Sequence, residues 1–71
     1  MSMSEKIRIL LIKKGNISEA ELARRLNKTP QSFNAKMKRD NFTEKDLQVI
    51  ADVLNCEYKS TFILKETGEE I

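Results

Sequence analysis

The chain has 71 residues, one cysteine and no histidine. This length fits one small domain, and the cysteine and histidine counts exclude an internal disulfide and argue against a structural zinc site. We therefore expect no metal and no cofactor. No stretch resembles a signal peptide or reaches membrane-spanning length, so the sequence predicts a cytoplasmic protein without membrane contact.

The net charge of +2 hides a division along the chain. Residues 1–39 hold ten Lys or Arg and three Glu, whereas residues 40–71 hold three Lys and eight Asp or Glu. A locally basic surface is what nucleic-acid binding requires, although a solvated helix face produces the same pattern. Charge alone leaves both interpretations open.

The first helix is predicted over residues 4–14, with Ser4 as its N-cap and Gly15 as a left-handed C-terminal cap. Its apolar residues recur at helical spacing, with two additions that widen the buried face: Ile7, Leu10, Leu11, Ile9 and Ile12. We interpret this helix as scaffold.

Two helices separated by a very short turn are predicted over residues 19–26 and 30–39. Ser18 is a suitable N-cap for the earlier one, and Glu21 stands where it completes a capping box. Asn27 tolerates the left-handed conformation that ends a helix, and Thr29 then offers a new N-cap. The expected core of this unit is Leu22, Ala23, Leu26, Phe33 and Met37.

The outward face of the helix over residues 30–39 carries amide, hydroxyl, small and basic side chains. Placing Phe33 and Met37 inward exposes the candidate base-contacting residues Gln31, Ser32, Asn34 and Ala35. The candidate phosphate-contacting residues are Lys28, Thr29 with its neighbouring backbone N–H groups, Lys36, Lys38 and Arg39. Arg24 and Arg25 suit either solvent or DNA.

The segments ELARRL, NKT and PQSFNAKM resemble the helix-turn-helix of the phage Cro/repressor-type (Xre-like) transcriptional regulators. The resemblance covers roughly residues 5–55. It implies a lambda-repressor-like four-helix DNA-binding domain whose helix over residues 30–39 is the recognition helix. Glu19 stands where the family often has a phosphate-contacting Gln, and Asn27 where it usually has Gly.

The fourth helix is predicted over residues 44–54, with Thr43 as N-cap and Asp46 as its capping-box partner. Cys56 follows it as buried filler rather than as a reactive thiol, since no histidine is available to activate it. Residues 58–65 alternate between apolar and polar, interrupted by Ile63, and residues 66–68 form a turn that contains Gly68. With residues 69–71 as a short partner strand, this pattern predicts a C-terminal β-hairpin over residues 58–71.

A two-stranded hairpin is marginal in water, so we expect a second surface to support it. The dimer candidates are Tyr58, Phe62 and Leu64, which pair with a second subunit or fold back on their own core. The leading prediction is thus a mainly α, single-domain, non-enzymatic regulator of residues 1–71 that binds double-stranded DNA as a homodimer. The alternative is a protein-interaction module, antitoxin-like or adaptor-like, that uses the acidic half and the tail to bind a protein partner.

Overall fold

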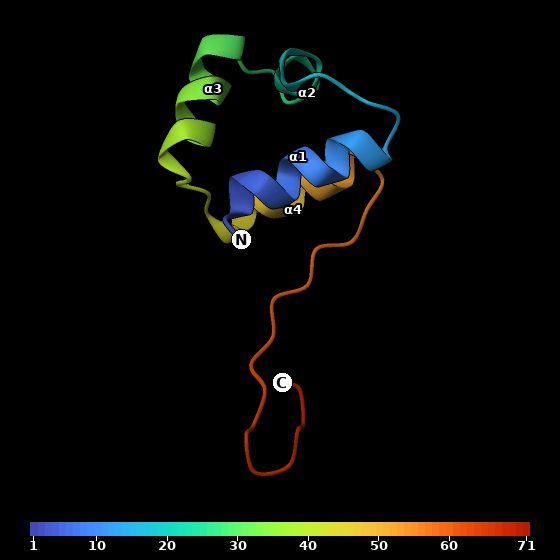
Figure 1. Ribbon diagram of the computed structural model, residues 1–71, viewed down its shortest axis with the longest axis vertical. Helices are drawn as coiled ribbons and strands as arrows, with labels where there is room; N and C mark the ends of the chain where they lie inside the picture. Colours follow the sequence, from blue (N-terminus) through green and yellow to red (C-terminus); the bar gives the residue numbers. More distant parts are fainter.

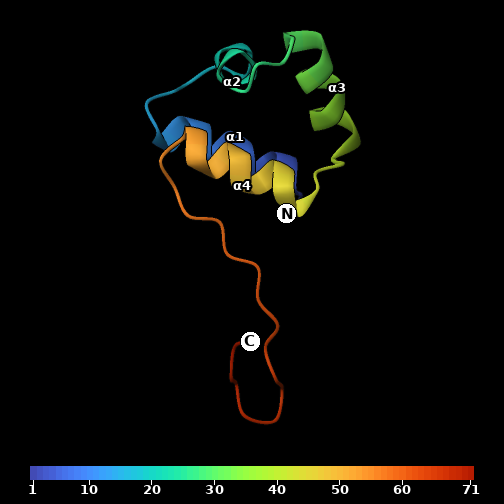
Figure 2. The ribbon, with the colours of Figure 1, turned by 180° about the vertical axis from the view of Figure 1, so that it is seen from behind.

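The computed structural model describes residues 1–71 and contains four α-helices (Figure 1). They are α1 (Met3–Lys13), α2 (Glu19–Arg25), α3 (Pro30–Arg39) and α4 (Glu44–Val53), each within one residue of its expected bounds. α3 lies at one end of α1 and α4, and α2 lies on the side opposite to the C-terminal tail (Figures 1 and 2). The prediction of a mainly helical protein with four helices is confirmed. None of the four helices has the length and apolar character needed to cross a membrane.

Every helix begins at a Ser or Thr whose side-chain oxygen accepts a first-turn backbone N–H: Ser2, Ser18, Thr29 and Thr43. Ser4 was the wrong N-cap for α1, because a complete capping box forms earlier. There Glu5 N donates to Ser2 Oγ over 3.1 Å, and Ser2 N donates back to Glu5 Oε1 over 3.4 Å. The box predicted for Thr43 and Asp46 is present, with N···O distances of 2.9 and 3.1 Å.

Every helix is also followed by an Asn or Asp with a left-handed backbone: Asn16, Asn27, Asp40 and Asn55, with φ between 53° and 59°. These short polar side chains tolerate this region better than other non-glycine residues do. After α2, the N–H of Lys28 donates to the Ala23 carbonyl over 2.9 Å, which closes the helix end in a Schellman-type arrangement. The sharp endings explain how four helices fit into little more than fifty residues.

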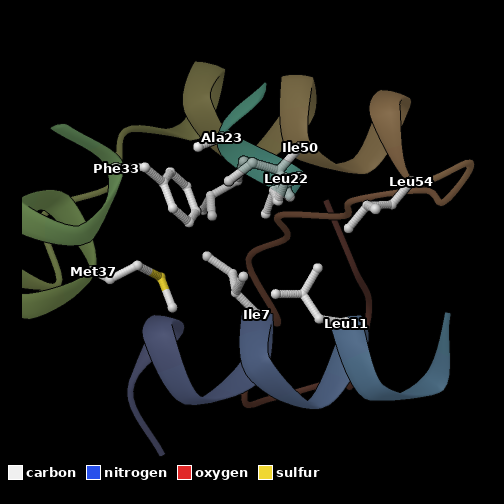
Figure 3. Close-up of a cluster of buried hydrophobic side chains, with 9 residues drawn as sticks. Ile7, Leu11, Leu22, Ala23, Phe33, Met37, Ile50 and Leu54 are labelled. Carbon is white, nitrogen blue, oxygen red and sulfur yellow. The ribbon is translucent and has the colours of Figure 1, made fainter. Parts of the chain in front are cut away.

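Nine buried side chains form one core between the helices: Ile7, Leu11, Leu22, Ala23, Phe33, Met37, Leu47, Ile50 and Leu54. Ile7 and Leu11 of α1 face Ile50 of α4 and its C-cap residue Leu54, with Leu22 between the two helices (Figure 3). Leu26 is half-buried against this cluster.

The predicted widening of the apolar face of α1 was wrong. Ile9 is 39% exposed and Ile12 is 63% exposed. At about 100° per residue, both positions point away from Ile7 and Leu11. They are solvent-facing apolar residues of a helix whose buried stripe is narrow.

Ser4 instead joins the start of α1 to the end of α3. Its backbone N–H donates to Asp40 Oδ1 over 2.8 Å, and its buried hydroxyl donates to the Met37 carbonyl over 2.7 Å. The hydroxyl also lies 2.9 Å from Asp40 Oδ1. Asp40 therefore acts as a cap for a helix more than thirty residues away in the chain, which fixes α3 relative to α1.

The predicted C-terminal β-hairpin is not supported. Residues 57–71 contain no strand, only an isolated antiparallel bridge between Ile63 and Glu70. The chain turns back on itself beside this bridge, where Phe62 and Ile71 exchange two backbone hydrogen bonds of 3.2 and 2.8 Å. The physical reason is the lack of a supporting surface, because the turn projects away from the helices (Figures 1 and 2) and leaves Phe62 81% exposed.

The projecting tail also explains the elongated shape. The Cα radius of gyration is 13.8 Å, and the principal extents are 44, 24 and 20 Å. A compact chain of this length is expected at about 11 Å. Tyr58 is the exception within the tail, since it is half-buried and packs against the core.

Candidate nucleic-acid interface

α2 and α3 form a closely packed pair joined by the turn over residues 26–29. Leu22 and Ala23 of α2 have no exposed surface, and Phe33 and Met37 of α3 are 4% and 2% exposed. The small side chain of Ala23 permits the close approach of α3. The Thr29 hydroxyl oxygen accepts the Ser32 N–H over 3.1 Å and so starts α3 directly after the turn.

The face of α3 opposite this core is available to a partner. Gln31, Ser32 and Asn34 are exposed, whereas Ala35 is half-buried between them. A shallow, open hollow on this face is lined by Pro30, Gln31, Asn34, Ala35 and Lys38. Four of the residues expected to contact DNA thus share one surface, with a small residue at its centre.

Ion pairs divide the basic residues near this face into two groups. Glu21 accepts from Arg24 and from Arg25, the latter over 2.9 Å, so both arginines form intrahelical ion pairs and neither is an unpaired cation. Arg8 pairs with Glu19 over 3.4 Å. Lys28, Lys38 and Arg39 form no ion pair, and all three are exposed.

Glu21 therefore does not complete the capping box predicted for α2. Ser18 Oγ accepts the Glu21 N–H over 3.0 Å, but the Glu21 carboxylate turns to the arginines instead of the Ser18 N–H. Hydrogen bonds from Arg24 first and Arg25 second hold the pKa of Glu21 below its ordinary value. The Glu21 carboxylate partly neutralises the positive charge of Arg24 and Arg25 on α2. This part of the surface therefore attracts a phosphate less strongly than unpaired arginines would.

Lys36, a candidate phosphate contact, is engaged in an ion pair within the protein. Its Nζ lies 2.8 Å from Asp46 Oδ2, across the junction of α3 and α4. The hydrogen bond from Lys36 is the largest cause that holds the pKa of Asp46 below its ordinary value, followed by the Thr43 backbone N–H. Lys36 thus holds α4 to α3, and a phosphate contact by this residue would have to compete with Asp46.

The hydrogen bonds between Ser4 and Asp40 fix the C-terminal end of α3 against the start of α1. Hydrogen bonds from the Ser4 backbone N–H and then from its hydroxyl hold the pKa of Asp40 below its ordinary value. Sequence reasoning missed this contact because the partners are 36 residues apart and Ser4 resembles an ordinary N-cap. The buried position of Ser4, at 4% exposed, is visible only in the folded structure.

Cys56 lies outside this interface. It is half-buried, and its thiol lies 3.4 Å from the Leu54 carbonyl oxygen. No three Cys, Asp or Glu side chains gather in a way that could hold a metal ion. The outward face of α3 and the turn before it carry three unpaired cations, Lys28, Lys38 and Arg39, beside exposed amide side chains.

The fold and this face define a small four-helix protein with an exposed polar and basic helix. Comparisons with protein-family models, with curated proteins and with solved structures returned no match to this chain.

Proposed function

We propose that this protein is a repressor-like, sequence-specific transcriptional regulator that reads the major groove of double-stranded DNA with α3. The α2–turn–α3 unit would then be a helix-turn-helix within a lambda-repressor-like domain of the Cro/repressor type. One observation carries the proposal: α3 exposes Gln31 and Asn34 beside Lys38 and Arg39, and neither cation has a carboxylate partner. A single helix fits the major groove, about 12 Å wide.

Gln31 is the principal base-reading residue in this proposal. It is exposed in the first turn of α3, the part of a recognition helix that approaches base edges. Its amide can pair with adenine through two hydrogen bonds, and Asn34 offers the same chemistry one turn later. Ala35 leaves room for a thymine methyl group, and Ser32 adds an adaptable hydroxyl.

Lys28, Lys38 and Arg39 supply the phosphate contacts, together with the N-terminus of α3 at Thr29. Unpaired cations contribute most, because they bind a phosphate without first breaking an ion pair. Lys36 has a secondary role because Asp46 holds it.

The apolar tail supports a homodimer. Phe62, Ile63 and Ile71 are 81%, 62% and 71% exposed, and a soluble monomer rarely presents such a cluster without a partner. Backbone groups beside Ile63 are available for pairing with the same segment of a second subunit. A two-fold dimer would present two α3 helices to half-sites about one DNA turn apart.

The same tail supports a second candidate function, a protein-interaction module. Its exposed apolar residues are accompanied by Glu66, Glu69 and Glu70, so a partner with an apolar and basic surface would fit. This role is compatible with DNA binding by α3.

The test compares Lys38→Ala with Arg25→Ala in binding to a random-sequence duplex at several salt concentrations. Each variant removes one positive charge, but only Lys38 is unpaired. We expect Lys38→Ala to reduce the slope of log affinity against log salt by about 0.9, and Arg25→Ala to change it much less. Equal effects would mean that net charge and not the α3 face governs binding, and no binding at low salt would overturn the proposed function.

A further inference from the structure

A hollow of about 280 Å³ lies at the junction of α3 and α4, beside the face assigned to DNA. Its apolar lining comes from Leu26, Phe33, Phe42, Val49 and Ile50. The rings of Phe33 and Phe42 are tilted by 59° with centroids 6.3 Å apart. Phe33 is only 4% exposed, so the half-buried Phe42 presents the accessible aromatic surface of the hollow. Val49 remains 43% exposed, so part of this apolar surface is open to solvent.

The rim of the hollow is positively charged. Lys28, Lys36 and Lys45 line it together with Ser32, and Asp46 is the single acidic residue. Asp46 is already engaged by the Lys36 ammonium over 2.8 Å and by the Thr43 N–H over 2.9 Å. Lys28 and Lys45 form no ion pair, so two unpaired lysines line the hollow together with Phe42 and Val49.

We propose that this hollow binds a small aromatic carboxylate. The ring would lie against Phe42 and Val49, and the carboxylate would face Lys28 and Lys45. The volume is near the lower limit of small-molecule sites, about 300 Å³, which fits one or two fused rings rather than a polypeptide segment. An apolar lining with a few converging polar groups is the usual composition of such sites.

A second groove of the protein has a less positive lining. It lies between α1 and α4, with a volume of about 390 Å³, and its charged lining consists of Lys6, Lys59 and Glu57. Its one aromatic lining residue is the half-buried Tyr58. The α3–α4 hollow has three lysines and one acidic residue, against two lysines and one acidic residue in the α1–α4 groove, so the hollow is the more positive of the two.

Binding at the hollow would regulate DNA binding, a consequence that rests on the proposed function. Lys28 and Ser32 line the hollow and are also among the residues proposed to contact DNA. A carboxylate held by Lys28 competes with a DNA phosphate for the same cation. Ligand and DNA would weaken each other's binding by the same factor, as thermodynamic linkage requires. The ligand site itself is tested without DNA.

The experiment titrates isotope-labelled full-length protein with 2-naphthoate and follows the backbone amide signals by NMR. Two compounds serve as controls. Acetate carries the carboxylate without the aromatic rings, and 2-naphthalenemethanol carries the aromatic rings without the charge. We expect saturable shifts centred on Ser32, Phe42 and Val49, with a dissociation constant below about 1 mM for 2-naphthoate alone. Shifts centred on the α1–α4 groove, equal binding of the neutral control, or no saturation would overturn the proposal.

Charge-reversal variants test whether the carboxylate of 2-naphthoate binds beside Lys45. Lys45→Glu should weaken 2-naphthoate binding about fivefold or more, whereas Lys6→Glu, the same charge change at the other groove, should leave it unchanged. Both residues are exposed, so both variants are expected to fold. Equal effects of the two variants would contradict a site at the hollow. Saturable binding by a protein that fails to bind DNA would retain this site and reject the proposed function.

Discussion

Replacing Ser4 by Ala tests whether the tie between α1 and α3 stabilises the fold. The substitution removes a buried hydroxyl that donates to the Met37 carbonyl over 2.7 Å and lies 2.9 Å from Asp40 Oδ1. A buried hydrogen bond contributes about 0.5–1.5 kcal/mol and one to a charged group about twice that, so we expect a loss of about 1–2 kcal/mol. For 71 residues this corresponds to a decrease in Tm of about 7–13 °C.

The assay is thermal and urea unfolding followed by circular dichroism, with Ser60→Ala as the matched control. Ser60 is exposed in the tail, and its substitution should leave the free energy of unfolding unchanged. Ser4→Ala and Asp40→Ala should be non-additive, because the two side chains share one contact. A Ser4→Ala protein with the wild-type Tm would refute the stabilising role of the tie.

The same contact predicts a pH dependence. Ser4 lowers the pKa of Asp40 in the folded state, so the stabilisation is present above the unfolded-state pKa of about 3.9 and is lost as pH falls through the folded value. Wild-type protein should therefore lose more stability on acidification below about pH 4 than Asp40→Asn. Identical acid profiles for the two proteins would contradict the assigned cause.

Three further predictions concern the recognition face, α4 and the tail. Gln31→Ala should relax base discrimination at one position of the DNA site, at a cost of about 1–3 kcal/mol measured by competition binding; unchanged discrimination would mean that α3 is oriented differently. Thr43→Ala removes the N-cap of α4 and should lower the free energy of unfolding by about 1 kcal/mol in urea titrations, whereas a neutral result would show that the cap contributes nothing. Phe62→Ser should convert a dimer into a monomer in sedimentation experiments; a monomeric wild type above micromolar concentration would remove the dimer proposal.

Local signals in the sequence were sufficient to predict the helices. The Thr29–Pro30 and Thr43–Asp46 starts and the Asn27 ending depend on contacts within five residues, and all of them appear in the structure. The inward positions of Leu22, Ala23, Phe33 and Met37 follow from helical periodicity alone, and these side chains are buried.

Contacts between distant segments could not be predicted in this way. The role of Ser4 depends on Asp40, and the pairing of Lys36 depends on Asp46 in another helix. The prediction of a hairpin in the tail was not supported for a related reason. The alternation around Phe62 indicates a strand, but no helical surface lies beneath this segment to stabilise one.

Selection of bound sequences from a random pool of duplex DNA tests the proposed function most directly. We predict enrichment of a palindromic site whose half-sites are separated by about one helical turn, and loss of preference at one position of each half-site with Gln31→Ala. A pool that stays random after repeated selection with the wild-type protein would contradict sequence-specific recognition by α3.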